Sequence, residues 1–236
     1  LTCVLLSKSA RQLGIYNPED NPHDSVTFIG VGGIGSFAAF GAAKLGIPNI
    51  TLIDPDVVEL HNQPNQFYGE GDIGDSKVYA LAGHIRADRG FHGELTAYVA
   101  KAPGFDASLD RLGGVVVSGL DSMEARQSVW EECIKLNPAV PLYLDARISG
   151  EFIVIYACNP TDMGDIEAYE RTLYSDDEAE AIACTERGII DVGLQVGSMV
   201  TRLLRRHFTG KEIDRTTMMN QDTLTATTGG WPPVAS

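Results

Sequence analysis

Long apolar runs are absent from the 236-residue sequence. A membrane-spanning helix needs ~18 or more consecutive apolar residues, and no stretch of the sequence approaches that length. The beginning of the sequence also lacks the basic region, the long apolar core and the small-residue cleavage site of a secretory signal peptide. We therefore expect a cytoplasmic protein with no membrane partner.

Basic residues are also scarce. The chain has 18 Lys and Arg residues against 32 Asp and Glu residues, which gives a formal net charge of −14 and a pI of about 4.6. A negative field of this size opposes the phosphate backbone of nucleic acids and the surface of an anionic bilayer. The charge balance therefore predicts no nucleic-acid partner and favours a basic protein partner.

Closely spaced cysteine pairs are missing as well. The four cysteines, Cys3, Cys133, Cys158 and Cys184, lie far apart and form no Cys-x-x-Cys pair. This spacing is typical neither of a zinc site nor of a disulfide-rich secreted domain. We expect free thiols in a reducing compartment and no bound zinc.

Apolar residues make up 44% of the chain, which is enough for one large hydrophobic core. Strand and helix patterns alternate along it. Strands are expected at 25–30, 49–54, 94–100, 114–118, 141–146 and 151–157, and helices at 33–45, 76–89, 122–136 and 188–208. Repeated strand–helix–strand units favour a parallel sheet with right-handed crossovers. The pattern predicts an α/β fold with a Rossmann-like, doubly wound sheet, mainly parallel with antiparallel strands at the C-terminal side.

The expected organisation is an N-terminal segment at 1–24, one domain at 25–227 that ends in a hairpin, and a flexible tail at 228–236. Residues 159–186 stand out inside this domain, because they hold nine of the 32 acidic residues and one basic residue, Arg171. This composition predicts a solvated crossover segment.

A glycine-rich turn lies between the first expected strand and the first expected helix. Gly30, Gly32 and Gly35 form a Gly-x-Gly-x-x-Gly pattern, in which the glycines permit a tight turn, close approach to phosphate and close helix–strand packing. Asp54 ends the next strand, where a carboxylate can accept hydrogen bonds from ribose hydroxyls. The pattern predicts a nucleotide site without distinguishing a dinucleotide from ATP.

Further motifs follow the glycine turn in order. They are Asp54-Pro-Asp-Val-Val-Glu-Leu-His-Asn-Gln-Pro-Asn-Gln66, Asp72-Ile-Gly-Asp-Ser-Lys77, Gly119-Leu-Asp121-Ser-Met-Glu-Ala-Arg126 and Cys184-Thr-Glu-Arg-Gly-Ile-Ile190. Together with the turn, this series resembles the ThiF/MoeB family, whose members are relatives of the ubiquitin-activating enzymes. The resemblance extends from about Ser25 to Phe208.

Members of that family use ATP and Mg²⁺ to adenylate the C-terminal carboxylate of a small β-grasp protein, ubiquitin-like or sulfur-carrying, that ends in Gly-Gly. The resemblance therefore implies an adenylyltransferase that works as a homodimer. It implies phosphate contacts from Gly30, Gly32, Gly35 and Lys77, a ribose contact from Asp54, nucleotide contacts from Asn62, Asn65 and Gln66, and a magnesium ligand in Asp121. Arg11 resembles the arginine that a partner subunit inserts into the site.

The nucleophile of such a reaction needs no general base, because a C-terminal carboxylate has a reference pKa of about 3.3–3.7. The protein must instead position two anions and supply positive charge. Asn65 is a departure in this respect, since the family usually has arginine there. Arg11 or Arg126 could substitute, which we favour; otherwise the chain is a weakly active or inactive member that supports an active partner.

Cys184 occupies the place where some ThiF-like enzymes carry the cysteine that receives the activated protein. The start of a helix would lower the pKa of its thiol, whereas the acidic neighbour Glu186 opposes that change. Both an acceptor cysteine and an inert cysteine therefore stay open.

Two other activities are considered. A family member that activates a small carboxylate, as in the dehydratase acting on threonylcarbamoyladenosine in tRNA, would have to bind tRNA against the charge of −14. An NAD-dependent Rossmann dehydrogenase would leave the motifs at 62–66, Lys77 and Asp121 without a role.

Overall fold

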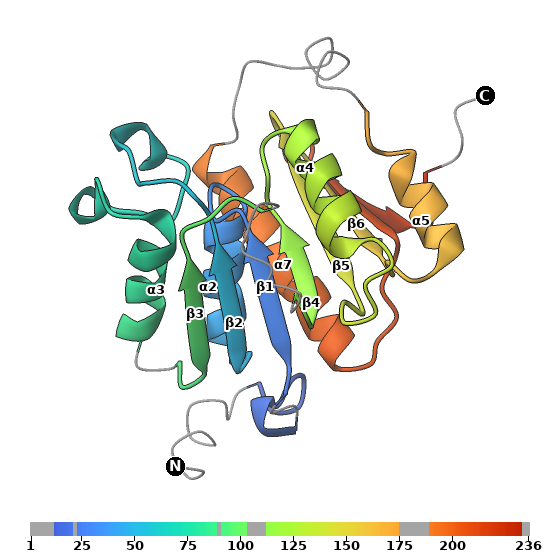
Figure 1. Cartoon of the computed structure of the whole chain (residues 1–236), viewed down its shortest axis with the longest axis horizontal. Coiled ribbons are helices and arrows are strands. Elements are labelled where there is room, and N and C mark those ends of the chain that lie inside the picture. The colour runs from blue at the N-terminus through green and yellow to red at the C-terminus, as the bar shows by residue number, and fades with distance from the viewer. Residues whose placement is uncertain (1–11, 21–22, 89–90, 103–111, 175–188, 233–236) are drawn as a thin grey trace.

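The computed structural model describes residues 12–20, 23–88, 91–102, 112–174 and 189–232. Their framework is an eight-stranded sheet in the order β3-β2-β1-β4-β5-β6-β7-β8 (Figure 1). The strands are β1 (Ser25–Ile29), β2 (Asn49–Ile53), β3 (Glu94–Tyr98), β4 (Val115–Ser118), β5 (Tyr143–Ser149), β6 (Phe152–Cys158), β7 (Thr216–Asn220) and β8 (Thr225–Gly229). Neighbours from β3 to β5 in this order pair in parallel, and those from β5 to β8 pair antiparallel. The predicted fold class is confirmed.

Helices cover both faces of the sheet (Figure 1). They are α2 (Gly35–Leu45), α3 (Lys77–Ala87), α4 (Met123–Val129) with a π-helical turn at Trp130–Ile134, α5 (Met163–Glu170), α7 (Ile190–Phe208), and short 3₁₀ turns at Pro18–Asp20, Leu60–Asn62 and Glu70–Asp72. One hydrophobic cluster joins α2, α3 and α7 to the sheet, and a second joins α4 and α5 to it. The sheet is therefore packed on both sides, as a doubly wound fold requires.

The longest helix, α7, packs closely against α2. Its glycines allow this approach: a Cβ at Gly193 would lie 2.7 Å from Cε2 of Phe37, and a Cβ at Gly197 would lie 2.7 Å from Cβ of the same residue. Because positions four apart lie on one face of a helix, Gly193 and Gly197 both lie on the face of α7 that contacts α2. The expected amphipathic helix at 188–208 is confirmed from Ile190 onward.

The expectation of a solvated segment at 159–186 is wrong for its first part. Residues Met163–Glu170 form α5, in which Ile166 and Tyr169 are buried and belong to the second hydrophobic cluster. Asp165 is also buried, and its carboxylate lies 2.9 Å from the guanidinium of Arg215. Residues 175–188, which include Cys184, lie outside the described residues.

The expected flexible tail also begins too early. Thr228 and Gly229 belong to β8, which pairs with β7 in the expected C-terminal hairpin. The indole N–H of Trp231 donates a hydrogen bond to Asp165 at 2.8 Å, and its ring stacks on Tyr156 with 6.1 Å between the centroids. The chain is therefore packed onto the sheet through Trp231.

A partly buried carboxyl before β1, that of Asp24, should make stability depend on pH. Burial raises the pKa of Asp24 to about 6, although the hydroxyl of Tyr16 donates to it at 3.2 Å. Because the folded pKa exceeds the unfolded value, the folded state binds more protons between about pH 4 and 6, and stability falls as pH rises through that range. Asp24→Asn should therefore raise the free energy of unfolding at pH 7 by about 1 kcal/mol, allowing for partial exposure, and the gain should vanish below about pH 4. Urea unfolding at both pH values checks this, and an equal gain at both would contradict it.

Candidate functional site

The candidate site lies at the carboxyl ends of β1, β2 and β4. The chain leaves β1 for β2 on one side, whereas β4 pairs with β1 on the other, so this is the topological switch point of the sheet. Ligands of open α/β sheets bind in the crevice at such a point. The glycine turn, Asp54 and Asp121 all follow strands that end here.

Two glycines of the turn are required by the protein's own packing. Gly30 has φ of +83°, and a Cβ there would lie 2.9 Å from the carbonyl oxygen of Gly119. A Cβ at Gly35 would lie 1.9 Å from the carbonyl oxygen of Gly30. Gly32 differs, because the nearest atom to its Cβ position is Nε2 of Gln66 at 3.8 Å. A Cβ at Gly32 would thus be in ordinary contact with Gln66, so the protein's own packing does not require glycine at this position.

Asn65 and Gln66 face this turn with unused polar atoms. The side-chain oxygens of both residues are buried and accept no hydrogen bond. Such groups cost free energy unless something pairs with them, and a polar ligand at the turn could do so. Asn62 is different, because its oxygen accepts from the backbone N–H of Glu59 at 2.8 Å and closes the 3₁₀ turn.

Asp54 is buried at the end of β2, and its carboxylate is held by the backbone. It accepts hydrogen bonds from the N–H groups of Val31 and Asp56, each at 2.8 Å. Burial raises the pKa of Asp54, and these two bonds oppose the rise. Asp54 thus fixes the glycine turn against β2, while its contact with ribose stays a prediction.

Lys77 opens α3 and lies beside Asp54 rather than in solvent. Its side chain is 8% exposed, and its ammonium lies 3.0 Å from a carboxylate oxygen of Asp56. The backbone N–H of Lys77 also donates to the carbonyl of Asp56 at 3.0 Å. The structure therefore brings Lys77 to the β2 side of the site, although its contact with phosphate stays a prediction.

Two residues that the sequence analysis did not single out organise this side of the site. The hydroxyl of Ser36 donates to the carbonyl of Gly32 at 2.6 Å and accepts from the N–H of Phe67 at 3.1 Å. The hydroxyl of Tyr68 donates to the carbonyl of Val31 at 2.7 Å. Both tie the segment around Gln66 to the glycine turn. Nothing in the sequence marks these roles, because the contacts of Ser36 with Phe67 and of Tyr68 with Val31 each span more than 30 residues.

Asp121 follows β4 on the other side of the turn and is exposed. Ser122 caps the next helix by accepting from the N–H of Ala125 at 3.2 Å. Within the part of the chain that the structure describes, no three His, Cys, Asp or Glu residues are grouped as metal ligands. Mg²⁺ commonly takes one carboxylate together with substrate phosphates, so the exposed Asp121 fits such an ion.

Arg126 is a poor substitute for the arginine missing at position 65. Its guanidinium is buried, donates to Asp145 at 2.9 Å and also donates to the carbonyl of Leu120. Its charge is therefore engaged inside the protein, contrary to our expectation that it could face the phosphates. Arg11, the other candidate, lies outside the described residues.

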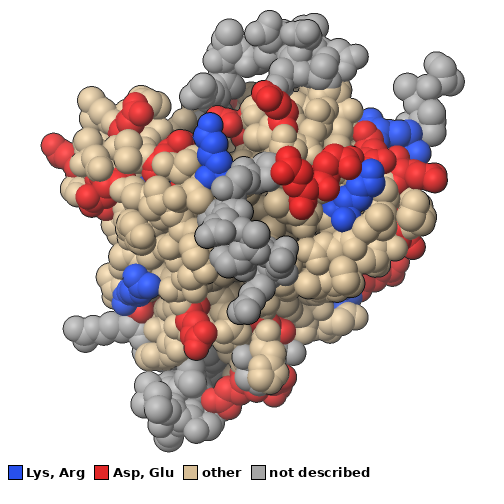
Figure 2. Space-filling view, in the orientation of Figure 1, with Lys and Arg blue, Asp and Glu red and all other residues tan. Residues whose placement is uncertain are grey.

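The lengths of the helices and the distribution of charged side chains on the surface are the features that concern possible partners. No helix in the described ranges is long and apolar enough to cross a membrane. Figure 2 shows acidic side chains spread over the displayed face, with basic side chains in a few separate places. The basic side chains form no large patch in this view.

Comparison with known sequences finds relatives that are named as activating enzymes for ubiquitin-like proteins. Ubiquitin-like modifier-activating enzyme 5 of Oryza sativa subsp. japonica is 27% identical over 223 residues, which cover 83% of this chain and 52% of the relative. The Nedd8-activating enzyme E1 catalytic subunit of Drosophila melanogaster is 38% identical over 103 residues, 43% of this chain and 23% of the relative. The chain spans about half the length of the first of these relatives.

Solved structures share the fold at low sequence identity. The E. coli protein MccB, solved with ATP, has a TM-score of 0.73 and 17% identity, covering 98% of this chain and 71% of MccB. PaaA has a TM-score of 0.74 and 17% identity over 96% of this chain and 73% of PaaA. A model of the ThiF family matches residues 19–234. The chain therefore belongs to the ThiF family.

Proposed function

We propose that this domain uses ATP and Mg²⁺ to adenylate the C-terminal carboxylate of a small β-grasp protein that ends in Gly-Gly. The observation that carries the proposal is the pair of buried, unpartnered amide oxygens of Asn65 and Gln66, in the segment that contacts the glycine turn at Gly32 and Gly33. Lys77 begins α3 and pairs with Asp56 just after β2, and Asp121 follows β4, so both belong to segments near the carboxyl ends of these strands. The ribose hydroxyls or the adenine amino group of a bound nucleotide could donate to these oxygens, whereas its phosphate oxygens only accept hydrogen bonds.

The chain's own residues would hold the nucleotide in three ways. The first turn of α2 has no side-chain cap, so its backbone N–H groups are suited to an anion. Asp56 keeps the ammonium of Lys77 at the same edge, where it can offset phosphate charge. Asp54 fixes the turn itself through Val31 and would use its remaining acceptor capacity for ribose. Mg²⁺, when bound at Asp121, would supply further positive charge to the phosphates.

The arginine that position 65 lacks would come from Arg11 of a second subunit. Arg126 is engaged by Asp145, which leaves Arg11 as the candidate from the sequence. This assignment, and the homodimer that it requires, are part of the proposal. Without such a cation the chain would be the scaffold-type member considered as the alternative.

Cys184 would act after adenylation if it is an acceptor. Its thiolate would attack the carbonyl carbon of the acyl adenylate, a C–S bond would form, and AMP would leave with the bonding electrons. Replacing Cys184 with Ser should then leave adenylation intact and abolish the thiol-labile adduct.

The proposal is tested by ATP–pyrophosphate exchange in the presence of candidate Gly-Gly proteins from the same genome. Exchange should require the partner protein and Mg²⁺, and Asp121→Ala should lower it by about 10²- to 10³-fold. Asp222→Ala, an exposed aspartate between β7 and β8, is the matched control and should leave exchange unchanged. No exchange with any such partner, despite a folded protein, would overturn the proposal.

Two further results would identify the alternatives. Calorimetry that detects no ATP binding would favour an inactive scaffold. Retention of tRNA in a filter-binding assay would favour activation of a small carboxylate on tRNA, against the acidic surface.

A further inference from the structure

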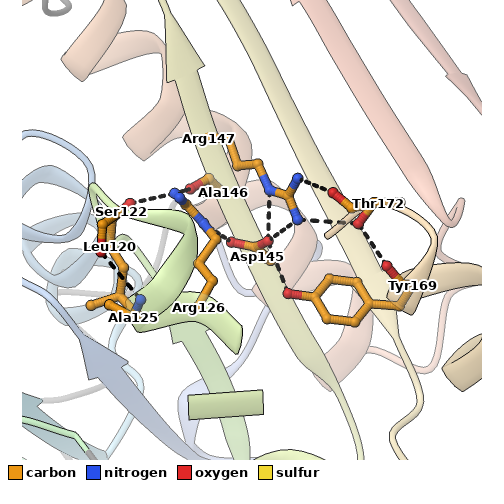
Figure 3. Close-up of polar contacts among 9 residues, drawn as sticks. All are labelled: Leu120, Ser122, Ala125, Arg126, Asp145, Ala146, Arg147, Tyr169 and Thr172. Atoms are coloured by element: carbon orange, nitrogen blue, oxygen red, sulfur yellow. Dashed lines mark hydrogen bonds and ion pairs between the residues drawn. The ribbon is translucent and has the colours of Figure 1, made fainter. Parts of the chain in front are cut away.

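A buried ion network lies next to the candidate site, on the side of the sheet covered by α4 and α5. Asp145 on β5 is fully buried between two guanidinium groups (Figure 3). One carboxylate oxygen accepts from Nε of Arg126 at 2.9 Å, and the other accepts from Nε of Arg147 at 2.8 Å. The hydroxyl of Tyr169 also donates to Asp145, at 3.0 Å.

The network joins two parts of the backbone that are distant in sequence. Arg126 donates to the carbonyl of Leu120, the residue before Asp121, and to the carbonyl of Ala146. Arg147 donates to the carbonyl oxygen of Thr172 at 2.8 Å and to its hydroxyl at 3.1 Å. One carboxylate therefore holds, through the two arginines, both the loop after β4 and the turn that follows α5.

The charges of Asp145, Arg126 and Arg147 are all buried, which is an inefficient way to stabilise a fold. Two arginines and one aspartate carry a net charge of +1, and each guanidinium is less than a tenth exposed. Burial alone would raise the pKa of Asp145, but Arg147 and Arg126 hold it below its ordinary value, so the carboxylate stays ionised. Buried ion pairs often contribute less to stability than apolar residues of the same volume. Such a network is better explained by the geometry that it imposes.

We propose that Asp145 is a positioning residue, which acts through Arg126 to fix the backbone of Leu120 and so the place of the Asp121 carboxylate. This inference rests on the proposed magnesium role of Asp121. Ser118 on β4 pairs with Asp145 on β5 in the parallel register, so the network begins where β4 ends. The fork of Arg126 is suited to the role, because one planar group can reach the carboxylate and the carbonyl together.

The test compares the affinity for ATP with and without Mg²⁺, measured by calorimetry on the full chain. The informative quantity is the dissociation constant without Mg²⁺ divided by the dissociation constant with Mg²⁺, because it reports the contribution of the Asp121 carboxylate. A change in the folded fraction alone would leave this ratio unchanged. Arg126→Met leaves a neutral Asp145–Arg147 pair, so it avoids an unpaired buried charge. We expect it to lower the ratio by about tenfold, with little change in affinity without Mg²⁺.

Two variants keep the test decisive. Arg126→Lys retains the charge but cannot present a planar fork, so its ratio should lie between those of the wild type and Arg126→Met; it carries the test if the methionine variant does not fold. Tyr169→Phe removes another hydrogen bond to the same carboxylate and leaves Arg126 in place, so its ratio should stay within about twofold of the wild type.

The outcomes separate this inference from the proposed function. An unchanged ratio in the folded Arg126 variants, or an equal loss in Tyr169→Phe, would overturn the positioning role. If Asp121→Ala itself leaves the ratio unchanged, or the wild type binds no ATP, the proposed function fails instead, and the positioning role fails with it.

Discussion

Replacing Lys77 with methionine is expected to slow ATP–pyrophosphate exchange by about 10²- to 10³-fold, the loss typical of removing one preorganised group from a developing charge. The ammonium of Lys77 is held 3.0 Å from Asp56 at the carboxyl edge of β2, where the phosphates of ATP would lie. Methionine keeps an unbranched apolar stem, ends one atom before the position of the ammonium and removes the positive charge. The loss should therefore appear in the exchange rate at saturating ATP more than in stability.

A second lysine provides the control for this experiment. Lys44 on α2 is about half exposed and forms an ion pair with Asp88 at 2.9 Å, so Lys44→Met also removes one charge and one ion pair. It should leave exchange unchanged, because surface ion pairs contribute about 0–1 kcal/mol and Lys44 lies at the opposite end of its helix from the glycine turn. A similar loss in both variants would indicate an effect of net charge rather than a contact at the site.

The parallel half of the sheet could be predicted from the sequence because its signals are local. The strand at Ser25–Ile29 leads into the glycine turn, and Gly46 ends α2 with φ of 95°, as a C-terminal glycine should. The glycine turn and Asp54 could be placed at one edge for the same reason, since the carboxyl ends of parallel strands meet there.

The acidic composition of the sequence around α5 gave no sign that this helix packs against the sheet. Acidic residues dominate its neighbourhood, yet Ile166 and Tyr169 are three apart and share one buried face. Asp165 is compensated by Arg215, which is 50 residues away in the sequence. Sequence reasoning therefore counted Asp165 as solvated charge, whereas the fold pairs it.

The position of Arg126 shows why part of the site could not be predicted. Its motif spacing places it near Asp121, and that much is correct. Whether its guanidinium faces a ligand or a buried carboxylate depends on Asp145, which lies on the next strand. The burial of Lys77 and the unpartnered amides of Asn65 and Gln66 are tertiary in the same sense, because each depends on elements that the chain brings together only in the fold.

Gly35→Ala should be the most damaging single-methyl change in the glycine turn. The added Cβ would lie 1.9 Å from the carbonyl oxygen of Gly30. That atom belongs to the backbone at the end of β1, which is held between β2 and β4. The turn must open to admit it, which should cost about 3 kcal/mol in the free energy of unfolding. Because the same turn faces the phosphates in our proposal, ATP affinity should fall by about tenfold or more, equivalent to about 1.4 kcal/mol. Urea unfolding and calorimetry with ATP measure the two effects.

Gly83→Ala is the matched control, since it adds the same methyl group to an exposed position of α3. No atom lies within 4 Å of the Cβ position at Gly83, so the substitution meets no obstacle. Alanine is favoured over glycine inside a helix, and this variant should gain about 0.5–1 kcal/mol with unchanged ATP affinity. Opposite signs for the two alanines would locate the effect in the contact between Gly35 and Gly30. If Gly35→Ala were as stable as the wild type and bound ATP equally well, the close approach of α2 to β1 could not be what shapes the nucleotide site.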